Sequence, residues 1–244
     1  MDRPVVELDN SDSVYDFYLD HRPNRLRAKA ICAAMARRYR PRVHSSENAK
    51  SKLAGAFSQR VPIVVAINHI AENDSYVIAG SAWKGPLRPI IGRSQTLAKD
   101  ELFTADGHRR LIDAMGGIPV FRGKDHGIRA TNAAAQRLID VCATRLARRD
   151  HLVLFPEGTC NKSDPEVVQA IGSGLGHIVF RAAKQGASPV IVPVGLSYGL
   201  ESDGRGASVW IGEPISSLPT RPLDISRLVK NELQHAVDEA VARY

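Results

Sequence analysis

Short apolar runs along the chain alternate with longer segments in which apolar residues return every three or four positions. The short runs predict strands at Val61–Ile67, Leu87–Ile91, His151–Phe155 and Val190–Val194. The longer segments predict helices at Asp74–Trp83, Gly107–Met115, His126–Arg148, Gly174–Lys184 and Ile225–Ala242. Because strands and helices alternate, the sequence predicts an α/β fold with a mostly parallel central sheet flanked by helices.

A basic segment precedes the first predicted strand. Arg22–Val43 predicts a helix of about four turns that ends before Pro41. The polar stretch His44–Arg60 that follows is interpreted as a linker. We therefore divide the chain into residues 1–60, an acidic tail plus a basic helix that is a candidate for a membrane surface, and residues 61–244, the α/β domain.

The net charge of +7 is unevenly distributed. Residues 1–20 contain Arg3 against six acidic residues, whereas residues 21–60 contain eleven Lys or Arg against Glu47 alone. This asymmetry indicates a basic surface for an anionic partner, and the absence of a nucleic-acid-binding module favours an acidic membrane over nucleic acid. From its residues alone, the alanine-rich helix fits a helix docked on the core better than one embedded in the interface.

The bulk composition narrows the class of protein. With 43% hydrophobic and 24% charged residues among 244, the chain is typical of a globular domain. It has neither an apolar run of membrane-spanning length nor a secretory signal at its start, so we expect a cytoplasmic location. Cys32, Cys142 and Cys160 lie far apart, and no H-E-x-x-H motif occurs, so the sequence predicts no disulfide framework and no metal.

A polar cluster follows the first predicted strand. Asn68, His69 and Asp74 stand where an open α/β sheet usually binds ligands. Residues five apart point about 140° from each other on one helix, so His69 and Asp74 converge only if His69 lies in the turn and Asp74 opens the next helix. A carboxylate on one ring nitrogen would leave the other as a base. A helix cap and a turn histidine explain the same residues equally well.

Two further clusters offer groups for binding a substrate. Arg122, after two glycines and a short apolar run, could hold a phosphate bidentately, with Lys124 as an added charge; an isolated surface arginine is the alternative. In the second cluster, Glu157, Gly158 and Thr159 follow a strand and Pro156. This loop could present backbone N–H groups to an anion, with Glu157 accepting from a substrate hydroxyl or steadying Arg122. A tight turn built from proline and glycine is the alternative.

The last cluster is the buried strand that contains Pro193. Since proline removes a hydrogen-bond donor from the sheet, Pro193 predicts an edge, a bulge or a strand end. We expect it to shape the wall of the site and assign it no chemistry.

The four clusters, in this order, resemble the glycerolipid acyltransferase family, which includes the bacterial lysophosphatidate acyltransferases. The resemblance covers roughly residues 47–198. The matched blocks are N-H-x4-D (Asn68, His69, Asp74), a glycine-led run ending in arginine (Gly117, Ile118, Arg122), F-P-E-G-T (Phe155–Thr159) and an apolar strand with proline (Val192–Val194), together with a linking motif at Ala98–Phe103.

The chain departs from the family pattern after the third block. Cys160 and Asn161 replace the usual Arg-Ser, and Ile171–Gly174 replaces a Phe-Lys pair. These changes weaken the case for a simple phosphomonoester acceptor, unless Lys162 substitutes for the arginine. Cys160 could also be an acyl-accepting nucleophile, but it has no adjacent histidine in sequence and stands where the family has no catalytic group, so a neutral loop cysteine is preferred.

The resemblance implies transfer of a fatty acyl chain from acyl-CoA or acyl carrier protein to a hydroxyl of a glycerolipid precursor, lysophosphatidate or glycerol 3-phosphate, in phospholipid biosynthesis. It implies that His69 is the general base oriented by Asp74, and that the acceptor is held by Arg122, Lys124 and Glu157–Thr159. No cofactor or metal is implied.

A lipid substrate also favours docking of the basic helix on a membrane, with the protein peripheral on the inner face of the plasma membrane. A different lipid or polyol acceptor, a thioesterase using the same His-Asp pair and a non-catalytic lipid-binding relative remain alternatives.

Overall fold

The computed structural model describes residues 3–199 and 205–244, and within them seven strands form one sheet. The strand order is β1-β7-β6-β2-β5-β3-β4, and every neighbouring pair is parallel except β6 and β7. The α/β class with a mostly parallel sheet is therefore confirmed. The strands are β1 (Arg42–Ser45), β2 (Ile63–Ile67), β3 (Ser94–Lys99), β4 (Gly117–Val120), β5 (His151–Leu154), β6 (Val190–Ser197) and β7 (Ser208–Ile211).

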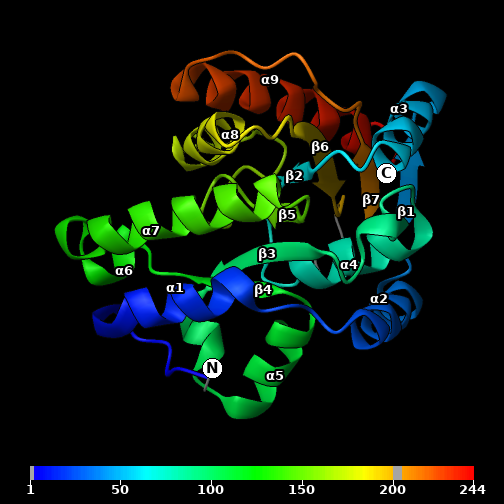
Figure 1. The fold of residues 1–244 in the computed structure, drawn as a ribbon. Helices are drawn as coiled ribbons and strands as arrows, with labels where there is room; N and C mark the ends of the chain where they lie inside the picture. Colours follow the sequence, from blue (N-terminus) through cyan, green and yellow to red (C-terminus); the bar gives the residue numbers. More distant parts are fainter. Residues whose placement is uncertain (1–2, 200–204) are drawn as a thin grey trace.

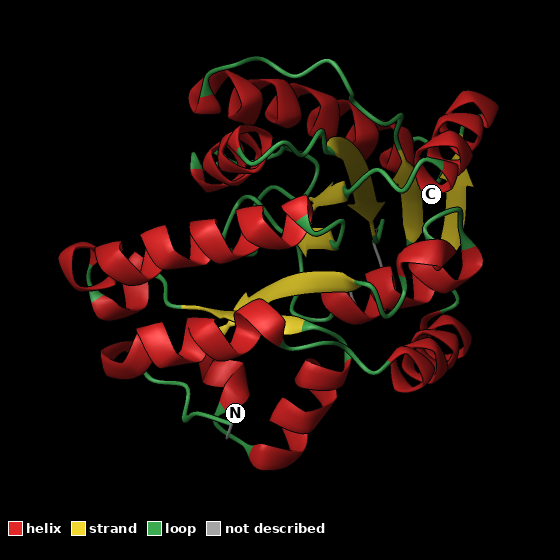
Figure 2. Ribbon diagram, in the orientation of Figure 1, coloured by secondary structure: helices red, strands yellow, loops and turns green. Residues whose placement is uncertain are grey.

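Helices cover both faces of the sheet (Figures 1 and 2). Helices α1, α7, α8 and α9 contribute to one apolar core, and α2, α3 and α4 pack on the other side. The bounds are α1 (Ser11–Asp20), α2 (Arg25–Tyr39), α3 (Glu47–Ser58), α4 (Asp74–Lys84), α5 (Asp106–Ala114), α6 (Gly123–His126), α7 (Ile128–Ala147), α8 (Gly174–Lys184) and α9 (Pro222–Val241), with short 3₁₀ turns η1 (Leu8–Asn10), η2 (Arg88–Ile90) and η3 (Asp100–Phe103).

Strand β2 shows why the sheet is buried on both faces. Its side chains alternate between the two cores: Val64 and Ala66 belong to one, and Ile63, Val65 and Ile67 to the other. All five side chains are buried, because β2 lies between β5 and β6 near the middle of the sheet. A continuous apolar run is the sequence signature of such a strand, which is how β2 could be predicted.

Two of the predicted elements are wrong. Leu87–Ile91, predicted as a strand, contains the 3₁₀ turn η2 instead, because Pro86 and Pro89 flank and enter the run and lack the N–H that a sheet requires. His44–Arg60, interpreted as a linker, contains the end of β1 and helix α3. The side chain of Ser46 caps α3 by accepting from the backbone N–H of Ala49 at 3.0 Å.

The remaining predicted elements are present within a few residues of their expected bounds, namely strands β2, β5 and β6 and helices α2, α4, α5, α7, α8 and α9. Pro193, where the sequence predicts an edge, a bulge or a strand end, lies within β6 at an irregularity in its pairing with the chain around β7. Residues 192–193 of β6 lie opposite residues 212–214, between the paired positions Ile191–Ile215 and Val194–Ile211. The extra residue lies on the partner segment, and the carbonyl of Pro193 accepts from the N–H of Gly212 at 2.9 Å.

The N-terminal residues pack on the body of the protein. Tyr15 and Tyr18 of α1 are fully buried in the core. The buried guanidinium of Arg145, on α7, donates to the carbonyls of Tyr18, Leu19 and His21 at 2.8, 3.0 and 2.9 Å. The division of the chain at residue 60 stays a prediction.

Helix α2 is docked on α4 with its basic side exposed. Ala28, Cys32 and Ala36 are buried beneath it. The helices approach so closely that a Cβ added at Gly80 would lie 2.9 Å from the backbone nitrogen of Ala36. Docking of this helix on the body of the protein is therefore confirmed. None of the helices in the described ranges is both long and apolar enough to cross a membrane.

The buried His151 predicts a dependence of stability on pH. Burial and the charge of Arg93 lower its pKa from 6.5 to about 4, and its Nδ1 accepts from the backbone N–H of Ile63 at 3.1 Å. The unfolded chain therefore binds a proton below pH 6.5 that the folded protein excludes until about pH 4. This difference lowers the free energy of unfolding as the pH falls through that range, by up to about 3 kcal/mol.

Urea denaturation between pH 4 and 7.5 tests this expectation with His151→Asn, which keeps a neutral acceptor. The variant should lose part of the wild-type decrease in stability below pH 6.5, whereas His235→Asn, at an exposed histidine of α9, should retain it. Equal pH dependence in wild type and His151→Asn would contradict the assignment.

Candidate active site

His69 and Asp74 meet at the carboxyl end of the central strands. His69 lies in the turn that follows β2, and Asp74 is the first residue of α4. The ring Nδ1 of His69 is 2.8 Å from Oδ2 of Asp74, so the convergence expected from the N-H-x4-D spacing is present. The carboxylate is fully buried, whereas the His69 side chain is 21% exposed and can therefore be reached from outside.

The carboxylate of Asp74 is held by four hydrogen bonds. Oδ2 accepts from His69 and from the backbone N–H groups of Ile70 and Ala71 at 2.7 and 3.0 Å. Oδ1 accepts from the hydroxyl of Tyr198 at 2.5 Å. A buried charge without such partners would be strongly unfavourable, so these bonds keep the carboxylate in place beside the histidine.

Tyr198 was missed by the sequence analysis. It follows the last residue of β6, and it is a buried residue that donates to Asp74. Burial and the charge of Asp74 raise its pKa well above the usual range, so the hydroxyl stays protonated and remains a donor. The available signal was a tyrosine directly after the proline-containing strand, at the edge where the site was expected.

The arrangement orients His69 as a base. With its Nδ1 proton directed at the carboxylate, the ring presents a lone pair at Nε2. The ring of Phe155 packs against it, with ring centroids 4.5 Å apart. Such a histidine can accept a proton at Nε2, and Asp74 then stabilises the imidazolium that forms.

Cys160 lies against the same imidazole. Its Sγ is 3.2 Å from Nε2 and 3.7 Å from Nδ1, and these similar distances place the sulfur beside the ring rather than in line with the Nε2 lone pair. Cys160 therefore has a histidine neighbour in the folded protein, although none is adjacent to it in the sequence. Burial, followed by the charge of Asp74, raises the pKa of the Cys160 thiol. The resting thiol is therefore neutral, as expected for the loop cysteine.

The backbone of His69 is clamped by the loop after β5. Oε1 of Glu157 accepts from the backbone N–H of His69 at 2.8 Å, and Oε2 accepts from that of Gln169 at 2.9 Å. The carbonyl of His69 accepts from the N–H of Asn161 at 2.6 Å. Burial raises the pKa of Glu157. Among the described residues Glu157 bonds these backbone groups and not Arg122, so its observed contacts are those of a brace for His69.

Arg122, which lies between β4 and α6, reaches the same loop. Its Nε and Nη2 both lie 2.6 Å from Oδ2 of Asp125, and its Nη1 donates to the carbonyl of Gly158 at 3.4 Å. Gly158 has a φ of +67°, which glycine adopts readily and other residues rarely do. The side chain of Lys124, two residues after Arg122, is exposed, and Thr159 is half-buried. A phosphate that bound the Nε and Nη2 edge of Arg122 would therefore have to displace Asp125.

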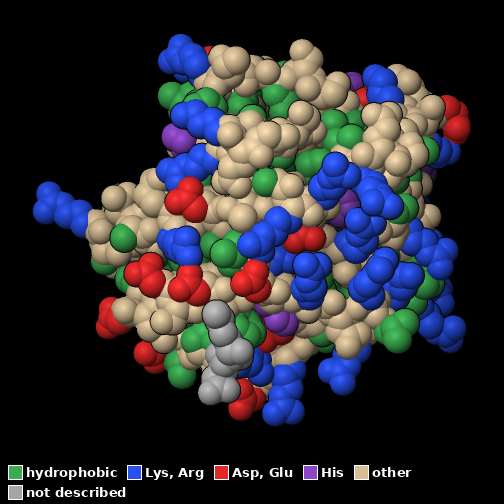
Figure 3. All heavy atoms as spheres, viewed as in Figure 1, with side chains coloured by type: hydrophobic (Ala, Val, Ile, Leu, Met, Phe, Trp, Pro, Cys, Tyr) green, Lys and Arg blue, Asp and Glu red, His purple; other side chains and the backbone are tan. Residues whose placement is uncertain are grey.

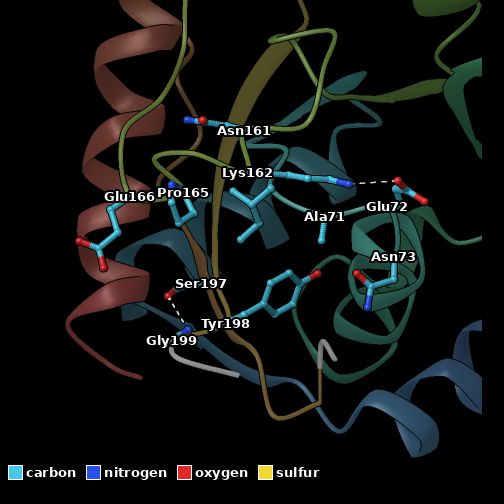
Figure 4. Close-up of a pocket in the computed structure, with 11 residues that line it drawn as sticks. Ala71, Glu72, Asn73, Asn161, Lys162, Pro165, Glu166, Ser197, Tyr198 and Gly199 are labelled. Carbon is cyan, nitrogen blue, oxygen red and sulfur yellow. Dashed lines mark hydrogen bonds and ion pairs between the residues drawn. The ribbon is translucent and has the colours of Figure 1, made fainter. Parts of the chain in front are cut away.

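A cavity of about 600 Å³ lies beside the turn that follows His69 (Figure 4). Its walls come from the turn after His69, the loop after Cys160 and the end of β6, and Tyr198 forms part of them. Across this space Lys162 Nζ pairs with Glu72 at 3.2 Å, so the lysine that could have replaced the family arginine has a carboxylate partner. The lining residues are Ile70, Ala71, Glu72, Asn73, Asn161, Lys162, Pro165, Glu166, Ser197, Tyr198 and Gly199.

One family comparison matches this region of the chain. The model of the family described as Acyltransferase matches residues 40–197, more than half of the chain and the whole dyad with its supporting loops. No curated protein gives a match. Within residues 3–199 and 205–244, no group of three or more His, Cys, Asp and Glu side chains could hold a metal ion.

The contact between Tyr198 and Asp74 predicts a loss of activity in Tyr198→Phe. A hydrogen bond to a buried charge contributes about 1.5–3 kcal/mol, so we expect kcat for acyl transfer to fall about tenfold or more. Without the hydroxyl the carboxylate becomes more basic and favours the imidazolium, so the acid limb of the rate profile should move to higher pH.

Tyr18→Phe is the matched control. Tyr18 is also buried, and its hydroxyl donates to Asp113 at 2.8 Å, away from His69. This control should lower stability without moving the pH profile. If Tyr198→Phe had an unchanged kcat and an unchanged pH–rate profile, Tyr198 would have no role in catalysis.

Proposed function

Because the chain belongs to the acyltransferase family, we propose that it moves a fatty acyl chain from a thioester, acyl-CoA or acyl carrier protein, to a hydroxyl of a glycerolipid precursor. Lysophosphatidate and glycerol 3-phosphate are the proposed acceptors, and phospholipid biosynthesis is the proposed process. The observation that carries the proposal is the accessible His69 ring, bonded to Asp74 at 2.8 Å, at the carboxyl end of the sheet.

The proposed reaction is a direct acyl transfer. Nε2 of His69 takes the proton from the acceptor hydroxyl as its oxygen attacks the thioester carbonyl. The C–S bond then breaks, and the thiolate leaves with the proton returned by His69. Asp74 stabilises the imidazolium between these steps, and general-base catalysis of this kind is worth about a hundred- to ten-thousand-fold.

The acceptor head would lie on the side of Arg122. Arg122 and Lys124 supply positive charge, and the turn at Gly158 and Thr159 supplies backbone and hydroxyl groups. The exchange of Asp125 for a phosphate keeps the guanidinium paired before and after binding. Holding the acceptor in this way lowers the entropic part of the barrier.

The acyl chain would enter apolar space behind Phe155. A cavity of about 70 Å³ lies there between α4 and the sheet, lined largely by apolar side chains that include Val65, Ile78, Ala82 and Ile90. Typical ligand pockets begin at about 300 Å³, so a long chain would have to move these side chains as it enters. Because Phe155 also packs on His69, a chain in this space would leave its thioester beside the base.

The exposed side of α2 is the proposed membrane contact. Lys and Arg side chains gather on this side of the molecule (Figure 3), and Leu26 is 82% exposed between Arg25 and Arg27. No ion pair of Arg25, Arg27 or Lys29 occurs among the described residues. Unneutralised cations beside an apolar side chain suit the surface of an anionic bilayer, on the inner face of the plasma membrane.

Release of free thiol from long-chain acyl-CoA tests the reaction. The purified protein is assayed with lysophosphatidate, with glycerol 3-phosphate and without an acceptor. We expect release with one of these acceptors and a fall of about a hundredfold or more in His69→Ala, because the base is removed.

His235→Ala, at an exposed histidine of α9, should retain the wild-type rate. Full turnover in His69→Ala would refute the mechanism. Release that needs no acceptor would identify a thioesterase instead.

Co-sedimentation with vesicles containing anionic lipid tests the membrane contact. Each cation near an anionic surface contributes about 1 kcal/mol, so replacing Arg25, Arg27 and Lys29 by Glu should lower partitioning by roughly a hundredfold. The matched control replaces Arg221, Arg227 and Lys230, exposed at and near the start of α9, by Glu. Equal losses in the two variants would show that net charge, and not α2, governs binding.

A further inference from the structure

The cavity beside Tyr198 has no role in the reaction described so far. The acceptor head is assigned to Arg122 and the acyl chain to the apolar space behind Phe155, which leaves the carrier arm of the donor without a place. We infer that the 600 Å³ cavity binds the uncharged, amide-bearing pantetheine arm of the acyl thioester. The inference rests on the proposed acyl transfer and names the site of one of its substrates.

The position of the cavity fits a donor whose thioester lies at His69. Ile70 and Ala71, the two residues after His69, form one wall, so the cavity begins at the turn that presents the base. Tyr198 forms another wall and donates to Asp74. A chain that leaves the reacting carbonyl on this side would enter the cavity directly.

The charges of the lining favour a neutral occupant. Among the described residues that line the cavity, Lys162 is the only one with a cationic side chain, and it pairs with Glu72 at 3.2 Å. Glu166 adds a second carboxylate. A phosphate would therefore meet a lining of net negative charge. The amides of a pantetheine arm would instead meet polar groups that can form hydrogen bonds with them, such as the hydroxyl of Ser197 and the carboxylate of Glu166.

The size of the cavity also fits the arm. Its volume of about 600 Å³ lies within the roughly 300–1,000 Å³ of typical ligand pockets. Apolar walls from Ile70, Pro165 and the Tyr198 ring supply contact area between the polar groups. Since the Tyr198 ring borders the cavity while its hydroxyl holds Asp74, an occupied cavity would also fix the dyad.

Pro165 offers the sharpest test. It is an exposed loop residue on the wall across from Asn73 in Figure 4, so a large side chain there would fill the cavity without entering the core. We expect Pro165→Trp to raise KM for acyl-CoA about tenfold while KM for the acceptor stays within about twofold. His235→Trp, which adds the same bulk at an exposed residue of α9 outside the cavity lining, should keep both constants near wild type.

A truncated donor separates the arm from the acyl chain. S-acyl-N-acetylcysteamine keeps the thioester and one amide but lacks the rest of the arm, so Pro165→Trp should raise its KM much less than that of acyl-CoA. An increase in KM for the acceptor, or no change in either KM, would overturn the inference. An inactive wild type would instead refute the proposed acyl transfer itself, so the two failures are distinguishable.

Discussion

A buried carboxylate with four hydrogen-bond donors governs the geometry of this site. Asp74 has no contact with solvent, and its oxygens are satisfied by His69, two backbone N–H groups and Tyr198. Loss of any one donor would leave the buried Asp74 charge only partly compensated, which is energetically unfavourable. The turn after β2, the start of α4 and the end of β6 must therefore keep their relative positions. The sheet maintains them: Asn68 exchanges two hydrogen bonds with the backbone of Leu196, which joins the ends of β2 and β6.

The loop after β5 adds rigidity from the opposite side. Glu157 and Asn161 bond the backbone of His69 through its N–H and its carbonyl, while the ring of Phe155 packs on the imidazole. The base is thus fixed at its backbone, its ring face and its Nδ1. A side chain held in this way loses little conformational entropy when the substrates bind, which is a usual requirement for an efficient catalytic group.

The parts of the site that the sequence revealed are those encoded by neighbouring residues. His69 and Asp74 are five positions apart, and the buried strand, the turn and the helix cap between them follow from local rules. The contacts of Tyr198 and Cys160 depend on which strands are neighbours in the sheet, and a single sequence does not show that order. Glu157 was expected to serve a substrate because its type and position fit that role, whereas its observed partners are backbone groups that carry no sequence signal.

The strand order also has a consequence for biosynthesis. The edge strand β1, made early, pairs only with β7 among the described strands, and the Tyr198 donor to Asp74 comes 124 positions after the carboxylate it serves. Neither the sheet nor the hydrogen bonds around Asp74 can be completed before β7 and Tyr198 have left the ribosome. Contacts of such high sequence separation slow folding and leave apolar strands exposed in the meantime. Nascent chains that stop before β6 should therefore be clients of chaperones rather than compact intermediates.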